Sequence, residues 1–283
     1  MWAYIYRNGQ NDAWQGYSAF TMILPFIEQD AVYQQVRTAS QTFFFGWNSG
    51  QVEVARSARL GTFQCPSDSR FPATATGREN NTGCNYGVSF GSTLLWTNIN
   101  EQNGMFRGPT DDITLARQMS REVTFADVRD GLSNTLMLSE HLSGNNNTGS
   151  LMVGQSSEVR RNSAAPSGPT QFPSQADLEA WGQQCAEITD HLSSNGNHWI
   201  APLPTQTALN TVAPPNWRFP NCQWGPSGYA SDRNGLYAPR SRHPGGVNAA
   251  LGDASVRFIS ETVDFQTFQR LGARDSGVAI QLD

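Results

Sequence analysis

The chain has 283 residues, a formal net charge of −5 and 15% charged residues, and all 19 of its basic residues are arginine. This length is enough to bury a sizeable core, in one large domain or two small ones. The negative charge argues against nucleic acid or an anionic membrane as the main partner, and the absence of lysine excludes Schiff-base and P-loop lysine chemistry. The sequence shows no signal peptide and no run of about 20 apolar residues that would span a membrane.

The first half of the chain is predicted to combine short helices with a strand. Residues 17–36 are predicted to form two short helical pieces broken at Pro25, because proline removes a backbone donor and clashes with the preceding turn. A strand is predicted from Thr135 to Glu140, directly after an Asp130-Gly131 turn.

Residues 143–240 are predicted to be a loop-rich insertion. Residues 143–173 are rich in Gly, Asn, Ser and Pro and indicate a long loop. Ser174 is expected to be the N-cap of a helix that runs to about Ile188. Residues 193–240 follow neither the helical nor the strand period, so we expect ordered, irregular loops there.

Residues 241–264, "SRHPGGVNAALGDASVRFISETVD", alternate in polarity as a β-hairpin does. We expect the segment His243-Pro244-Gly245-Gly246 to form the bend before the first strand and Asp253 to lie in the turn after it. At roughly 3.3 Å per residue the strand separates His243 from Asp253 by about 20 Å or more. A catalytic His–Asp pair needs roughly 2.6–3.2 Å, so the two residues are expected to be structural.

The turn of this hairpin has two alternatives: a two-residue Gly252-Asp253 turn, or a four-residue loop from Gly252 to Ser255. We expect the longer loop, with Leu251 opposite Val256. Both alternatives place the same five side chains on one face of the hairpin: Val247, Ala249, Leu251, Val256 and Phe258. After the hairpin, Thr262 is expected to cap a short helix that Gly272 ends.

Strands, isolated short helices and long loops together predict an α+β fold with an antiparallel sheet, in a single domain that spans residues 1–283. The four cysteines have no C-x-x-C spacing, and their even number indicates two disulfides formed in an oxidising compartment. The pairing Cys65–Cys84 and Cys185–Cys222 closes the shortest loops and is the one we predict. The alternative is four free thiols in a cytosolic protein.

Several sequence patterns resemble catalytic or metal-binding motifs, and each also has a structural explanation. Residues 87–91 match G-x-S-x-G, but a nucleophile elbow needs a helix after the serine, and the following sequence favours a strand. The four histidines lack the i, i+4 spacing of a zincin. Asp127 with Asp130, and Asp111 with Asp112, are candidate calcium ligands, although capping of turns is the favoured explanation.

Tryptophans in the predicted loops are candidates for carbohydrate binding, because flat aromatic faces stack on sugar rings. The chain has eight tryptophans, and the candidates are Trp199, Trp217 and Trp224. Packing of these side chains against the irregular loops is the favoured alternative.

Five segments occur in an order that resembles a bacterial type IV pilin-like family with a C-terminal H-x9-DG motif, which is also labelled extracellular solute-binding protein, family 10. They are "WQGYSAFTMILPFIEQDAVYQQV", "FQCPSD", "CNYGVSFG", "FADVRDGLSNTLMLSEH" and the 241–264 segment. The resemblance extends from about Trp14 to Val278. It departs at Ala254, where the motif has glycine, and at the start, where the family's long hydrophobic helix is missing.

The resemblance implies a non-catalytic structural protein, the head of a pilin-like or pseudopilin-like subunit at the cell surface or outside the cell. The implied partners are other pilin-like subunits, bound through the missing helix, so the isolated head is expected to be monomeric. No cofactor is expected beyond a structural calcium ion. The alternative is an extracellular module that binds a glycan, such as a polysaccharide, or another solute.

Overall fold

A computed structural model describes residues 2–7, 10–43, 57–69, 82–96, 98, 100–108, 123–146, 158–162, 164–225, 233–278 and 280. The predicted calcium candidates Asp111 and Asp112 lie outside these residues. Within them the chain has both helices and sheets, and the expected α+β class is confirmed.

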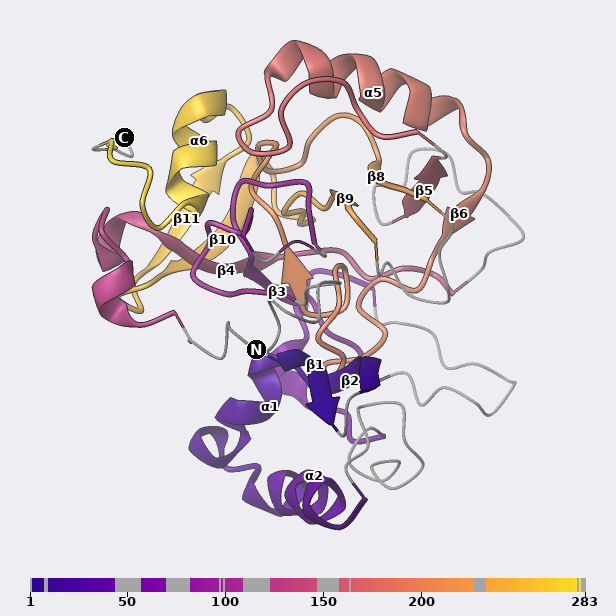
Figure 1. Cartoon of the computed structure of the whole chain (residues 1–283), viewed down its shortest axis with the longest axis vertical. Coiled ribbons are helices and arrows are strands. Elements are labelled where there is room, and N and C mark those ends of the chain that lie inside the picture. The colour runs from indigo at the N-terminus through magenta and orange to yellow at the C-terminus, as the bar shows by residue number, and fades with distance from the viewer. Residues whose placement is uncertain are drawn as a thin grey trace.

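The larger sheet has five strands in the order β11-β10-β4-β3-β7 (Figure 1). They are β3 (Tyr86–Ser89), β4 (Leu136–Glu140), β7 (Ala208–Leu209), β10 (Gly246–Leu251) and β11 (Val256–Ser260). The run from β11 to β3 is antiparallel, whereas β7 pairs with β3 in parallel. The sheet is therefore mixed, although most of it is antiparallel as predicted. Strand β4 confirms the strand expected from Thr135 to Glu140.

The smaller sheet lies within the segment that was expected to be loops. Its order is β6-β5-β8-β9, with β5 (Val159–Asn162), β6 (His191–Leu192), β8 (Asn221–Trp224) and β9 (Gly235–Leu236). The expectation of irregular loops is therefore partly wrong. Strands of two to four residues are too short to show an alternating pattern, and they pair with segments far away in the sequence.

Helix α5 (Gln175–Glu187) contacts β5 and β8 and lies at one end of the molecule in Figure 1. It begins as predicted, because the Ser174 side chain accepts a hydrogen bond from the Asp177 backbone N–H at 3.1 Å. The opposite end of the view holds the N-terminal elements: the hairpin β1 (Trp2–Arg7) and β2 (Gln10–Tyr17), then α1 (Ala19–Ile23), the 3₁₀ turn η1 (Leu24–Ile27) and α2 (Asp30–Phe43). Further 3₁₀ turns are η3 (Gly61–Phe63), η4 (Phe125–Asp127) and η5 (Leu132–Asn134).

The predicted break at Pro25 is confirmed. Pro25 lies in the first turn of η1, where its missing N–H has no helical partner to lose. Glu28 then takes a left-handed conformation, which separates η1 from α2. Helix α2 runs to Phe43, two turns beyond the predicted end at residue 36.

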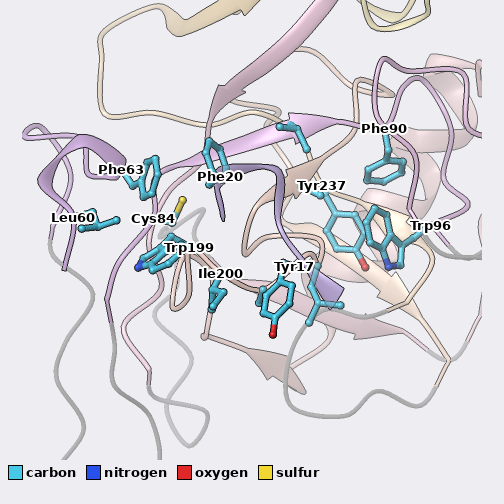
Figure 2. Packing of buried hydrophobic residues seen from close by; sticks show 14 of the residues in the cluster. Tyr17, Phe20, Leu60, Phe63, Cys84, Phe90, Trp96, Trp199, Ile200 and Tyr237 are labelled. Atoms are coloured by element: carbon cyan, nitrogen blue, oxygen red, sulfur yellow. The ribbon is translucent and has the colours of Figure 1, made fainter. Parts of the chain in front are cut away.

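Three apolar clusters form the core within the described residues. Figure 2 shows the largest, in which Phe20, Phe63 and Trp199 pack together around Cys84. The second joins α5 to the smaller sheet around the Cys185–Cys222 disulfide. The third packs helix α6 (Phe265–Gly272) on β4, β10 and β11. That helix is capped by Asp264, not by Thr262 as predicted, because the Asp264 carboxylate reaches the Thr267 N–H at 2.8 Å.

The expected disulfide pairing is half right. Cys185 and Cys222 are bonded, whereas Cys65 and Cys84 are free, so the predicted Cys65–Cys84 bridge is wrong. The two free sulfurs have different neighbours: Cys84 Sγ donates to the Tyr86 carbonyl at 3.3 Å, and Cys65 Sγ lies 3.7 Å from a ring nitrogen of His243.

The register of the C-terminal hairpin also differs from the prediction. Ala250 pairs with Val256, and Leu251 N–H donates to Ser255 O at 2.9 Å, so the loop has three residues rather than four. The odd loop length turns β11 over. As a result Val256 and Phe258 are 69% and 51% exposed, not buried beside Val247, Ala249 and Leu251 as predicted.

Candidate functional site

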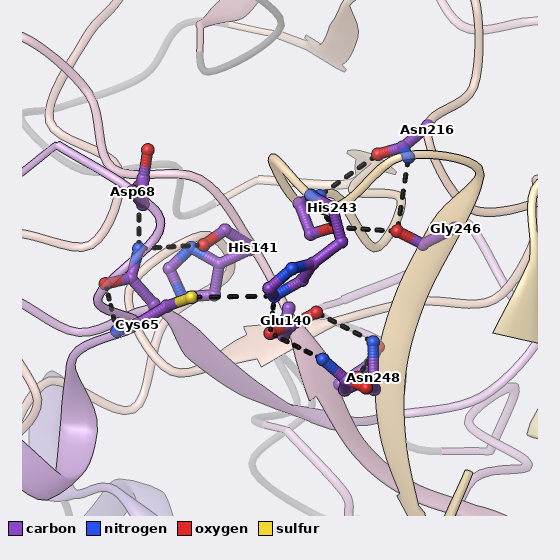
Figure 3. A network of polar contacts seen from close by, with 11 residues as sticks. Cys65, Asp68, Glu140, His141, Asn216, His243, Gly246 and Asn248 are labelled. Atoms are coloured by element: carbon purple, nitrogen blue, oxygen red, sulfur yellow. Dashed lines mark hydrogen bonds and ion pairs between the residues drawn. The ribbon is translucent and has the colours of Figure 1, made fainter. Parts of the chain in front are cut away.

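A thiol, a carboxylate and an imidazole meet at one point of the larger sheet (Figure 3). His243 Nε2 lies 3.1 Å from Glu140 Oε1 and 3.7 Å from Cys65 Sγ. All three ligand atoms lie within 4.8 Å of one another. The Glu140 side chain is 4% exposed and that of His243 is 29% exposed, so solvent reaches the group from the histidine side.

Strand pairing positions Glu140. It is the last residue of β4, and β10 runs antiparallel beside it. Asn248 on β10 donates its backbone N–H to Glu140 Oε2 at 2.7 Å and its side-chain amide to Oε1 at 3.3 Å. The buried carboxylate is thus held by fixed donors, which offset the cost of removing it from water.

The bend before β10 positions His243. Ser241 accepts the His243 backbone N–H at 3.0 Å and donates its hydroxyl to Gly246 O at 2.7 Å. Asn216 accepts the Ser241 N–H at 3.0 Å. Gly245 has φ +84, a conformation that glycine adopts without strain, so the bend depends on this residue. The predicted bend at residues 243–246 is confirmed.

Cys65 is held from the opposite side by an amide network. Its backbone N–H donates to Asn85 Oδ1 at 3.0 Å, and Asn85 Nδ2 donates to Asp68 Oδ2 at 2.7 Å and to His141 O at 3.1 Å. Asp68 also accepts from Arg242 Nε at 3.3 Å. Since Arg242 precedes His243 and His141 follows Glu140, one network connects all three segments of the group.

Burial shifts several pKa values around the group. Burial raises the pKa of the Cys84 thiol to about 12 and keeps it protonated. The pKa of Tyr86 also rises to about 12, through burial and then through the negative charges that Cys65, Glu140 and Cys84 can carry. Burial lowers the pKa of His141, whose Nε2 lies 3.2 Å from Gln206 O, so that histidine is neutral.

The three residues do not form a nucleophilic triad. In a Cys–His–carboxylate triad the histidine contacts the thiol through one ring nitrogen and the carboxylate through the other. Here Cys65 and Glu140 both face Nε2 of His243. Ser89, the centre of the G-x-S-x-G match, is fully buried at the end of β3, and no helix follows it in the described residues up to 96.

The predicted His243–Asp253 separation is confirmed, because the residues lie at opposite ends of β10. Asp253 accepts from the Ser255 N–H at 2.9 Å and hydroxyl at 2.7 Å. Its pKa is lowered by these hydrogen bonds. Asp253 therefore acts in the turn. The residues that His243 contacts are Cys65, which was expected in a disulfide, and Glu140, which was expected only as the end of a strand. Their proximity follows from the β4–β10 pairing and the loop after η3.

The candidate calcium ligands lie apart from this group and are engaged in capping. Asp127 accepts the Thr124 N–H and hydroxyl, each at 2.8 Å. Asp130 accepts the backbone N–H groups of Ser276 at 2.5 Å and Gly277 at 2.9 Å. These contacts agree with the favoured explanation that both aspartates stabilise turns.

The three candidate tryptophans are not gathered on one surface. Trp199 is fully buried and donates its ring N–H to Ala58 O at 2.8 Å, so it cannot stack on a sugar. Trp217 is 8% exposed at the edge of a surface pocket of about 480 Å³. Trp224 packs edge-on against Trp181. The carbohydrate hypothesis therefore loses Trp199, one of its three candidate residues, to the core.

One comparison with known proteins gives a match. The model of a family described as "SBP_bac_10: Protein of unknown function (DUF1559)" matches residues 4–266, which is most of the chain. Comparisons with curated proteins and with solved structures give no match.

Proposed function

The chain belongs to the DUF1559 family, and from that premise we propose that it is a non-catalytic structural protein of the cell exterior, the globular head of a pilin-like subunit. The observation that carries the proposal is the placement of the His243–Asp253 segment. It forms the bend and the turn at the two ends of β10, inside the antiparallel run β11-β10-β4-β3. The segment that most marks the resemblance therefore builds the sheet of the head.

Two further observations support an extracellular, non-catalytic role. The Cys185–Cys222 disulfide is typical of proteins that mature in an oxidising compartment. Neither residue considered for nucleophilic chemistry is placed for it. The Ser89 side chain is buried, and His243 faces both Cys65 and Glu140 with the same ring nitrogen. No helix in the described part of the chain is long and apolar enough to cross a membrane.

Assembly would then depend on other pilin-like subunits, bound through a hydrophobic N-terminal helix. The largest exposed apolar side chains form small groups on separate described elements: Met22, Ile23 and Phe26 in α1 and η1, Phe125 in η4, and Val256 and Phe258 in β11. Small, separate groups of this kind are ordinary on monomers. We therefore expect the head by itself to be monomeric.

The test is the N-terminus of the native protein, isolated from sheared surface material and from the culture medium and sequenced by mass spectrometry. The proposal expects an upstream hydrophobic helix that begins with a methylated residue after removal of a short leader, and enrichment in the sheared fraction. An ordinary signal-peptide cleavage, with the protein free in the medium, would refute the pilin-like role and favour a secreted binding module.

A further inference from the structure

We propose that Cys65, Glu140 and His243 form a binding site for a divalent cation of the zinc class. The site goes beyond the structural role proposed above, because a sheet and its hairpin need no metal. Its three ligands come from the loop after η3, the end of β4 and the bend before β10, which are 75 and 103 residues apart along the chain.

The spacing of the ligand atoms suits a tetrahedral ion. Zinc binds sulfur at about 2.3 Å and nitrogen or oxygen at about 2.0–2.2 Å, which places neighbouring ligand atoms about 3.3–3.8 Å apart. The sulfur–nitrogen distance from Cys65 to His243 is 3.7 Å, and the nitrogen–oxygen distance from His243 to Glu140 is 3.1 Å. The ligand atoms of Cys65 and Glu140 lie within 4.8 Å of each other, so a side-chain shift of at most about 1 Å brings the third pair into the same range.

Convergence on one nitrogen favours a cation over a hydrogen-bonded group. An imidazole nitrogen carries either one hydrogen or one lone pair. When His243 Nε2 donates its hydrogen to Glu140, it has nothing left to offer the Cys65 thiol, although both atoms face it. A cation at the common point uses a lone pair from each of the three groups. An ion pair between His243 and Glu140 therefore explains only that contact. A bound cation also explains why the Cys65 thiol points toward the same nitrogen.

Hydrogen bonds behind the ligands fix their orientation. Asn248 holds Glu140 Oε2 through its backbone N–H, which turns Oε1 toward His243. Ser241 holds the backbone of His243, and Asn85 holds that of Cys65. Outer contacts of this kind raise metal affinity because they place the ligands before the ion arrives. The 29% exposure of His243 gives an ion access, and three protein ligands leave a fourth position for water.

The donor set also selects the kind of cation. Calcium and magnesium prefer oxygen ligands, whereas a thiolate with an imidazole and a carboxylate suits zinc and cobalt(II). Cobalt(II) can therefore replace zinc as a spectroscopic probe, because its bond to a thiolate gives a charge-transfer band in the near ultraviolet.

The experiment is a cobalt(II) titration of the metal-stripped protein with the Cys185–Cys222 disulfide intact. We expect saturation at one equivalent, a thiolate-to-cobalt absorption band and displacement of the band by zinc. Zinc should also raise the Tm, since it binds the folded state. Glu140→Gln should weaken binding by about tenfold or more.

Cys84→Ala is the matched control, because it removes the other free thiol and leaves Cys65 in place. The band should persist in Cys84→Ala and disappear in Cys65→Ala. If Cys65→Ala fails to fold, the band in Cys84→Ala still assigns the thiolate to Cys65. Absence of the band in the wild-type protein, its persistence in folded Cys65→Ala, or a Cys65–Cys84 disulfide found by peptide mapping of the native protein would each overturn the proposal.

Discussion

Glu140 shows at the scale of one residue how the fold holds a buried carboxylate. Two donors of Asn248 and the ring of His243 surround it, and its side chain is 4% exposed. His243→Ala removes one of these partners, so we expect the free energy of unfolding to fall by about 1–2 kcal/mol in urea titrations. Asp253→Asn changes an exposed turn and should cost less than His243→Ala does. Equal costs for both variants would contradict this assignment.

We expect the buried Cys84 thiol to make the folded protein less stable at alkaline pH. Its pKa is raised by burial from 9.0 to about 12, so the unfolded chain releases the proton first and stability falls as the pH rises from 9 toward 12. Between pH 9 and 10 the loss from this group should be about 1 kcal/mol. Above pH 10 Tyr86 adds a loss of the same sign.

The measurement is urea unfolding at pH 8, 9 and 10, with Cys84→Ala as the comparison. The variant leaves a small cavity that lowers its absolute stability, so the pH dependence is the quantity compared. Its curve should be flatter by about 1 kcal/mol between pH 9 and 10. Parallel curves would show that the thiol is not protected from ionisation in the folded protein.

The hairpin β10–β11 shows at the scale of an element how one residue sets which side chains are buried. Ala254 ends the three-residue loop at φ +67, a left-handed conformation that glycine adopts more easily than alanine. The loop keeps the register Ala250–Val256 and with it the burial of Ile259 in place of Phe258. The strain at Ala254 is thus tolerated because the alternative register would expose Ile259.

Ala254→Gly should therefore stabilise the protein by about 0.5–1 kcal/mol, seen as a higher urea midpoint with an unchanged slope. Ala250→Gly, on the neighbouring strand of the same hairpin, is the control and should destabilise by a similar amount, because glycine weakens a strand interior. A loss of stability in Ala254→Gly would mean that the loop does not hold Ala254 in this conformation.

At the scale of the whole molecule, the Cys185–Cys222 disulfide connects helix α5 to β8 and so stabilises the smaller sheet. It closes a loop with a sequence separation of 37 residues, which corresponds to about 4 kcal/mol in the chain-entropy account. We expect reduction, or the double variant Cys185→Ala/Cys222→Ala, to lower the free energy of unfolding by that order. Hydrogen exchange should then accelerate in α5, β5 and β8 before it does in β4 and β10.

The double variant Cys185→Ala/Cys222→Ala is the control for the reductant. The reductant should leave the stability of this variant unchanged, because Cys65 and Cys84 are free. A further loss of stability on reduction of the double variant would reveal a second bridge. That result would restore the pairing that the sequence suggested for these two cysteines.

Local signals were enough for several elements and for the family. Ser174 and Asp177 lie three residues apart and make a helix cap by themselves, so the start of α5 was predictable. Proline is disfavoured inside a helix and tolerated in its first turn, so the end of α1 before Pro25 was predictable, and the bend at residues 243–246 follows from its proline and glycines. The same ordered segments were enough to indicate the family that the 4–266 match identifies.

The contacts between distant segments were decided only by the tertiary structure. The sequence placed His243 in a bend. Glu140 comes beside it because β4 pairs with β10, and Cys65 because Asn85 holds the loop after η3 there; contacts between segments so far apart leave no local pattern. The burial of Trp199 and the paired two-residue strands of the smaller sheet have the same origin. Composition and spacing fix what a short segment prefers, whereas the enclosure of each side chain depends on which remote segment lies against it.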